Sequence, residues 1–132
     1  MGYVVITAKP TKYRGVTFRS KLESDWARFL DRQGTEWEYE PRAFSTTLGC
    51  YLPDFWLPYL SMWAEVKPTE LDKVALTKIM DVSSQTGNNS LLLEGPPKHK
   101  VRMVEHCGDI QALHLYNGLH VVYFNLGGRK CL

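Results

Sequence analysis

The sequence predicts an α/β domain in which a mixed sheet is flanked by helices, and three observations lead to this prediction. The chain has 132 residues and 44% hydrophobic content, which suffices for one core but is too short for two ordinary domains. Two segments place apolar residues at the helical period. Short β-forming runs, bounded by proline, glycine or asparagine, lie between and after them. Helices mixed with strands in this way are typical of a sheet covered by helices.

The first half of the chain predicts one helix followed by three strands. The helix spans residues 20–33, and Gly34 can end it. Its apolar residues stand at i, i+4, i+7 and i+8, namely Leu22, Trp26, Phe29 and Leu30. The strands are expected over residues 35–40, 51–56 and 62–67. Pro58 marks the turn between the last two, which form a hairpin carrying Asp54 and Glu65.

The second half predicts a second helix and further strands. Thr69, with Asp72 three residues later, is a candidate cap for this helix. Its apolar face comprises Leu71, Val74, Ala75, Ile79 and Val82. Later strands are expected over residues 91–94, 101–105 and 119–125, and a short helix over residues 110–116.

Charged residues interrupt the apolar segment that follows Leu52. Asp54 precedes the sequence Glu65-Val66-Lys67 by eleven residues. Residues two apart on a strand share one face, so Glu65 and Lys67 are expected to point the same way. Burying an ion is costly unless the ion is paired or binds a metal. That cost favours a chemical role for these residues.

Pro53-Asp54 and Glu65-Val66-Lys67 resemble the PD-(D/E)xK motif of the restriction-endonuclease-like nucleases. Residues 14–23 and 38–41 also resemble the N-terminal part of small phage-type and transposon-type endonucleases of that superfamily. In those proteins a glutamate on the first helix joins the metal site, and Glu23 stands at the matching position. The resemblance covers roughly residues 13 to 80.

The resemblance implies a restriction-endonuclease-like fold and a Mg²⁺-dependent endonuclease acting on DNA, with Mn²⁺ able to replace Mg²⁺. It implies that Asp54 and Glu65 are metal ligands, assisted by Glu23 and by the carbonyl of Val66. Lys67 completes the expected catalytic set. One domain over residues 1–132 is then expected to contain a basic N-terminal arm, a catalytic core and the later strands of the sheet, over residues 1–19, 20–82 and 83–132.

The chemistry explains why these residue types occur together. Hydrolysis of a phosphodiester needs a nucleophilic water and stabilisation of negative charge at the phosphoryl group, and divalent cations supply both. Mg²⁺ prefers oxygen ligands and is usually held by a few carboxylates together with water and substrate phosphate. Lys67 can orient the water, deprotonate it if the lysine pKa is lowered, or neutralise the phosphorane. The sequence leaves these three roles open.

Each of these residues also has a structural interpretation. Ser20 and Glu23 form a capping-box pattern, in which Glu23 only reaches back to the helix start. Asp54 can be an ordinary turn residue, and Glu65 with Lys67 can be a surface ion pair worth under about 1 kcal/mol. For the whole chain, the alternatives are a noncatalytic nucleic-acid-binding or assembly module that keeps the fold, and a structural component of a phage or mobile element.

Nucleic-acid binding is suggested by where the basic residues stand. The net charge of +2 is too small to indicate a DNA-binding protein by itself. Basic residues nevertheless precede the first helix with no acidic residue among them. Ser20 and Arg19 also stand at the positive end of that helix, which suits a phosphate. We therefore expect DNA contacts from Lys12, Arg14, Arg19, Ser20 and Lys21, with a solvated basic arm as the alternative.

Other properties of the sequence bear on its partners and location. No stretch approaches the roughly 20 apolar residues of a membrane span, and the N-terminus does not resemble a signal peptide. We expect a cytoplasmic protein, or a nuclear one in a eukaryotic host, that needs no small-molecule cofactor. The three cysteines are widely spaced, which predicts reduced thiols. A homodimer would place two sites together for double-strand cleavage.

Overall fold

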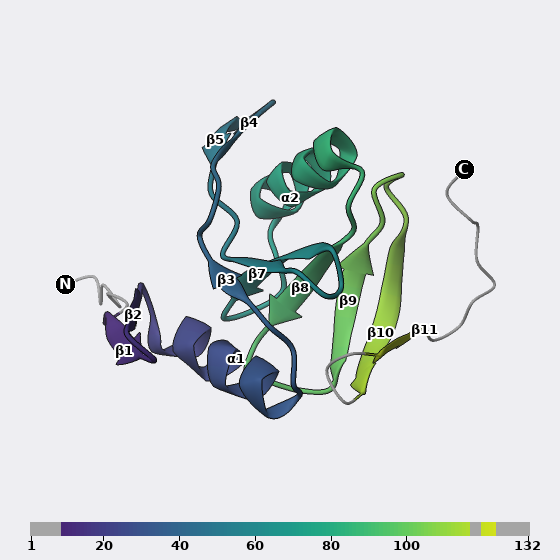
Figure 1. Ribbon diagram of the computed structural model, residues 1–132. Helices are drawn as coiled ribbons and strands as arrows, with labels where there is room; N and C mark the ends of the chain where they lie inside the picture. The colour runs from purple at the N-terminus through teal and green to yellow at the C-terminus, as the bar shows by residue number, and fades with distance from the viewer. Residues whose placement is uncertain (1–8, 117–119, 124–132) are drawn as a thin grey trace, which may run out of the picture.

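The computed structural model describes residues 9–116 and 120–123 (Figure 1). A mixed seven-stranded sheet forms the middle layer, and one helix covers each of its faces. The predicted α/β class, with a mixed sheet flanked by helices, is confirmed. Among the helices of the described residues, none has the length and apolar composition needed to cross a membrane.

The seven-stranded sheet has the order β11-β10-β9-β8-β7-β6-β3. Its strands in chain order are β3 Glu38–Tyr39, β6 Phe55–Leu57, β7 Met62–Lys67, β8 Ser90–Glu94, β9 Lys100–Val104, β10 Ile110–Tyr116 and β11 His120–Tyr123. Strands β7 and β8 are parallel, with Glu65 opposite Leu92. The remaining neighbours are antiparallel. Strand β7 lies inside the sheet, but its pairing with β6 covers only Met62, Trp63 and Ala64, so the Glu65-Val66-Lys67 segment pairs with β8 alone.

Helix α1 spans Lys21–Arg32 and confirms the first predicted helix. Its N-cap is Ser20, whose side chain accepts a hydrogen bond from the backbone N–H of Glu23. Helix α2 spans Lys73–Thr86 and ends at Gly87, which adopts the left-handed conformation at φ 71°. Thr69 was expected as its cap, but Asp72 holds this position because its side chain accepts the N–H of Ala75.

The two faces of the sheet carry separate cores. The first packs α1, through Trp26 and Leu30, against residues that include Ala64 and Val66 of β7. The second packs α2, through Ile79 and Val82, against residues that include Trp63 of β7 and Leu92 of β8. The alternation along β7 therefore places Glu65 and Lys67 on the face that carries Trp63 and α2. Val74, expected in the apolar face of α2, is instead 53% exposed.

Two small hairpins complete the architecture. Strands β1 Thr11–Tyr13 and β2 Val16–Phe18 are joined by Arg14 and Gly15, both with positive φ, as hairpin turns of this length require. The described part of the predicted basic arm, from residue 9 onward, thus contains a hairpin; its first eight residues lie outside the described part. Strands β4 Phe44–Thr46 and β5 Gly49–Tyr51 form the second hairpin.

Three sequence predictions of secondary structure need correction. The predicted strand over residues 51–56 is divided, since Tyr51 ends β5, Phe55 begins β6 and Asp54 lies in a bend between them. Pro53 lacks the backbone N–H that a continuous ladder would use. The strand over residues 35–40 shortens to β3. Residues 110–116, predicted as a helix, form β10, where Leu113 and Leu115 are buried at the two-residue period of a strand.

Candidate functional site

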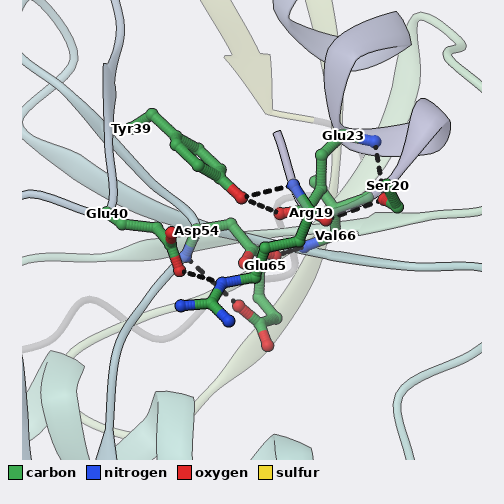
Figure 2. A network of polar contacts seen from close by, with 8 residues as sticks. All are labelled: Arg19, Ser20, Glu23, Tyr39, Glu40, Asp54, Glu65 and Val66. Atoms are coloured by element: carbon green, nitrogen blue, oxygen red, sulfur yellow. Dashed lines mark hydrogen bonds and ion pairs between the residues drawn. The ribbon is translucent and has the colours of Figure 1, made fainter. Parts of the chain in front are cut away.

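Three carboxylates from different elements converge beside the sheet (Figure 2). Glu23 lies in the first turn of α1, Asp54 in the bend before β6 and Glu65 in the middle of β7. The three carboxylates are close enough for their charges to act on one another. Burial is the largest cause that raises the pKa of Asp54 well above its ordinary value, and the charges of Glu65 and Glu23 come next. We call Glu23, Asp54 and Glu65 the carboxylate cluster.

Asp54 is held by the backbone of its neighbours. The N–H of Val66 donates to Asp54 Oδ2 at 2.8 Å. The N–H of Glu40 donates to the carbonyl of Asp54 at 2.8 Å. The backbone N–H of Asp54 in turn points to Glu65 Oε1 at 3.3 Å. The bend therefore orients Asp54 toward β7, and Val66 takes part in the site through its backbone.

Glu65 is a buried carboxylate, with 6% of its surface exposed. Burial raises its pKa, although hydrogen bonding from neighbours and the positive charge of Lys67 oppose this rise. Lys67 is half-buried on the same face of the strand, as the two-residue spacing predicts. Among the described residues, no partner forms an ion pair or a hydrogen bond with the Lys67 ammonium. Its charge remains available beside the carboxylate cluster.

Glu23 is held by two hydroxyl groups. Ser20 Oγ donates to Glu23 Oε2 at 2.7 Å, and the Tyr39 hydroxyl donates to Glu23 Oε1 at 2.7 Å. Tyr39 also accepts the N–H of Arg19 at 3.1 Å. The predicted capping box is therefore modified: Ser20 caps the helix, but the Glu23 carboxylate binds the two hydroxyls. Ser20 therefore serves as the cap, and the Glu23 carboxylate belongs to the cluster.

Arg19 forms the rim of the site. Its Nε donates to Glu40 Oε2 at 2.8 Å, and Figure 2 shows the side chain extending from the start of α1 to Glu40. Arg19 is 70% exposed and Glu40 only 17%. Glu40 has φ 47°, a left-handed conformation that is uncommon for a residue with a side chain. The Arg19 guanidinium therefore lies at the surface, whereas the Glu40 carboxylate that accepts its hydrogen bond is mostly buried.

The other predicted DNA-contacting residues lie in different places. Arg14 forms an ion pair with Asp31 in the last turn of α1, at 2.8 Å. Glu23 and Asp31 are eight residues apart, which on a helix corresponds to about 12 Å. Lys21 pairs with Asp25 at 2.9 Å on the exposed side of α1. Lys12 is exposed on β1. Of the five predicted contacts, Arg19 and Ser20 are therefore the ones whose hydrogen bonds connect them with the cluster.

Two tyrosines join the site although the sequence analysis did not select them. Tyr39 is half-buried in β3 and binds Glu23. Tyr51 is 8% exposed at the end of β5, and burial followed by the charge of Glu65 raises its pKa. Tyr39 stands 16 residues from Glu23, and Tyr51 lies on a different strand from Glu65, so spacing alone gives no signal for these two pairs. The partial signal for Tyr39 is its place within the 38–41 segment.

A second acidic group lies elsewhere and differs in chemistry. Ligand atoms of Glu105, Cys107 and Asp109 lie within 4.8 Å of one another. Cys107 is disulfide-bonded, which corrects the expectation of reduced thiols for this residue and removes its thiolate as a ligand. Cys50 is a free, exposed thiol. The carboxylate cluster differs in that it contains only carboxylates, from three separate elements, and its three side chains do not all offer ligand atoms within 4.8 Å of one another.

The donor set of the carboxylate cluster fits a hard divalent cation. It offers carboxylate oxygens only, which suits Mg²⁺ or Mn²⁺. Burial and mutual repulsion oppose full ionisation of Asp54 and Glu65, and a bound cation would relieve both effects. Asp54, Glu65 and Glu23 are the residues that would hold it.

Comparisons of the chain with protein families, with curated proteins and with solved structures found no match.

Proposed function

We propose that the chain is a metal-dependent nuclease of the PD-(D/E)xK kind that hydrolyses phosphodiester bonds in DNA. The observation that carries the proposal is the convergence of Glu23, Asp54 and Glu65 beside the ammonium of Lys67, which forms no ion pair within residues 9–116 and 120–123. The order of elements supports it: α1, a hairpin of β6 and β7, then α2 leading to β8 parallel to β7. This order agrees with the restriction-endonuclease-like fold that the motif resemblance implies.

The residues have distinct roles in this proposal. Asp54 and Glu65 are the principal ligands, Glu23 an auxiliary ligand and the Val66 carbonyl a further one. When bound, Mg²⁺ or Mn²⁺ supplies charge stabilisation at the phosphate and lowers the pKa of a coordinated water. Lys67 holds the attacking water or a phosphoryl oxygen, because its ammonium has no competing acceptor among the described residues.

Substrate binding would use the rim of the site. Arg19 is exposed, and its guanidinium can bind two phosphate oxygens at once. Ser20 and the first N–H groups of α1 lie beside it, at the positive end of the helix. Two copies of the chain would be needed to cut both strands of a duplex together, so a homodimer belongs to the proposal.

A cleavage assay tests this function. Labelled linear duplex, single-stranded and four-way-junction DNA, together with single-stranded RNA, are incubated with the protein in Mg²⁺, Mn²⁺ or EDTA. Lys67→Ala should abolish metal-dependent cutting, whereas Lys73→Ala, which removes an exposed lysine from α2, should leave it unchanged. Equal cutting by Lys67→Ala, or cutting in EDTA, contradicts the proposal. Binding without cutting in either metal would instead favour a noncatalytic nucleic-acid-binding module.

A further inference from the structure

Tyr51 presents a buried hydroxyl for which packing gives no reason. It ends β5 opposite Phe44 and belongs to the core on the α2 face, which also contains Trp63. Only 8% of its surface is exposed, and its hydroxyl completes no hydrogen bond of ordinary geometry. A buried polar group without a partner destabilises a protein. Phenylalanine would keep the ring contacts without that penalty, so the hydroxyl itself needs an explanation.

The hydroxyl of Tyr51 lies at the carboxylate cluster. The charge of Glu65, and then that of Asp54, acts on Tyr51 more than that of any other residue. The three carboxylates also differ in the hydrogen bonds that they accept. Glu23 accepts two hydroxyl hydrogen bonds, and Asp54 accepts a 2.8 Å bond from the backbone of Val66. Among the described residues, Glu65 accepts one hydrogen bond of ordinary geometry, the 3.3 Å bond from the N–H of Asp54, while the nearby side chains of Asp54 and Tyr51 also lower its pKa. The Tyr51 hydroxyl thus already approaches Glu65 without completing a hydrogen bond of ordinary geometry with it.

We propose that Tyr51 is a positioning residue that donates a hydrogen bond to Glu65 when the carboxylate cluster holds its divalent cation. The inference rests on the proposed function and names a residue that the PD-(D/E)xK motif does not include. A donor that binds one oxygen of a ligating carboxylate fixes how the other oxygen is presented. The role is one of orientation, because the phenol contacts the ligand and not the substrate.

The test compares Tyr51→Phe with the natural protein. Mg²⁺ and Mn²⁺ affinities are measured by calorimetry, and unfolding by urea is measured in EDTA. Tyr51→Phe should bind both metals about tenfold more weakly, which is typical of losing an outer partner of a ligand. Its urea midpoint in EDTA should be unchanged or higher. Tyr59→Phe, which changes a tyrosine that is 65% exposed, serves as the matched control and should alter neither property.

A double-mutant cycle with Glu65→Gln separates this role from a structural one. If Tyr51 acts through Glu65, Tyr51→Phe should no longer change the remaining metal affinity in the Glu65→Gln background. Equal metal affinities of the natural protein and Tyr51→Phe would overturn the inference and leave the proposed function intact. A lower urea midpoint for Tyr51→Phe in EDTA, with metal binding unchanged, would assign the hydroxyl to the fold. Failure of the natural protein to bind either metal would overturn the proposed function as well.

Discussion

The fold opposes the ionisation of Asp54 and Glu65 because it buries both carboxylates close to each other. Burial is the main cause for both residues. For Asp54 the second cause is the neighbouring charge of Glu65, so the two protons are released as a coupled pair. Two carboxylates placed in this way cost stability in the absence of a cation. Such a cost is typical of sites that are built for binding or catalysis.

The sign of the pH dependence follows from the direction of these shifts. A carboxyl group whose pKa is higher in the folded protein keeps its proton there while the unfolded chain has already lost it. Without metal, the contribution of Asp54 and Glu65 to stability should therefore fall as the pH rises above their ordinary pKa values, until the raised pKa values are passed. Urea unfolding in EDTA across this range would measure the fall.

Asp54→Asn should remove part of this cost. The amide keeps an oxygen for the N–H of Val66 but carries no charge. We expect the variant to be more stable than the natural protein at pH 7 in EDTA by about 0.5–2 kcal/mol, and its stability to vary less with pH. Saturating Mg²⁺ should stabilise the natural protein more than the variant. A variant that is less stable than the natural protein at pH 7 would contradict this account of the cluster.

Tyr39→Phe tests the support of Glu23. The change leaves Glu23 with the Ser20 hydroxyl alone and deprives the N–H of Arg19 of its acceptor. We expect a loss of about 1 kcal/mol in stability and slower metal-dependent cleavage. Tyr13→Phe is the matched control, since it also removes a phenol that donates to a carboxylate, that of Asp31. Slower cleavage by both variants to the same extent would show that only overall stability matters.

At the scale of the element, the start of α1 both caps a helix and organises the site. Ser20→Ala removes the N-cap and also a donor to Glu23. Asp72→Ala removes the N-cap of α2, which makes the same kind of contact with Ala75. Each change should cost about 1 kcal/mol in urea unfolding. Only Ser20→Ala should also weaken Mg²⁺ binding, and equal metal affinities for the two variants would limit Ser20 to capping.

The elements that the sequence predicted well are those whose own residues determine them. Helix α1 has a strong cap and a regular apolar period, and β7 matches its expected bounds of residues 62–67. The prediction of a helix over residues 110–116 was wrong because the apolar side chains there have spacings that fit either a helix or a strand. Only pairing with β9 decides between the two. The bend at Asp54 separates two strands that the sequence joins, since the pairing partners of β5 and β6 are different.

The same distinction explains which site residues could be predicted. Asp54, Glu65 and Lys67 stood out because charges in an apolar segment are unusual, and the structure brings them together with Glu23. The contacts of Tyr39 and Tyr51 join residues that come together only after folding. No periodicity or spacing rule predicts such long-range pairs.

At the scale of the whole molecule, the small net charge of +2 makes the position of each basic group more important than their number. Arg19 adjoins the cluster, whereas Arg14 pairs with Asp31 toward the other end of α1. Arg19→Gln should weaken DNA binding and reduce the slope of log K against log salt by about 0.7–0.9, as expected for one lost phosphate contact. Arg14→Gln should change that slope less. Equal slopes for the two variants, measured by fluorescence anisotropy, would show that the rim is not the DNA-binding surface.

The central claim is that the carboxylate cluster holds a divalent cation for phosphodiester hydrolysis. Its most direct test is the single-turnover rate of DNA cleavage against Mg²⁺ concentration for the natural protein, Asp54→Asn and Asp81→Asn. Asp81 contacts Thr47 rather than the cluster and serves as the control. We predict that Asp54→Asn loses about 100-fold or more in rate, beyond the usual effect of an outer partner, while remaining at least as stable. Cleavage by Asp54→Asn at the rate of the natural protein would contradict the account.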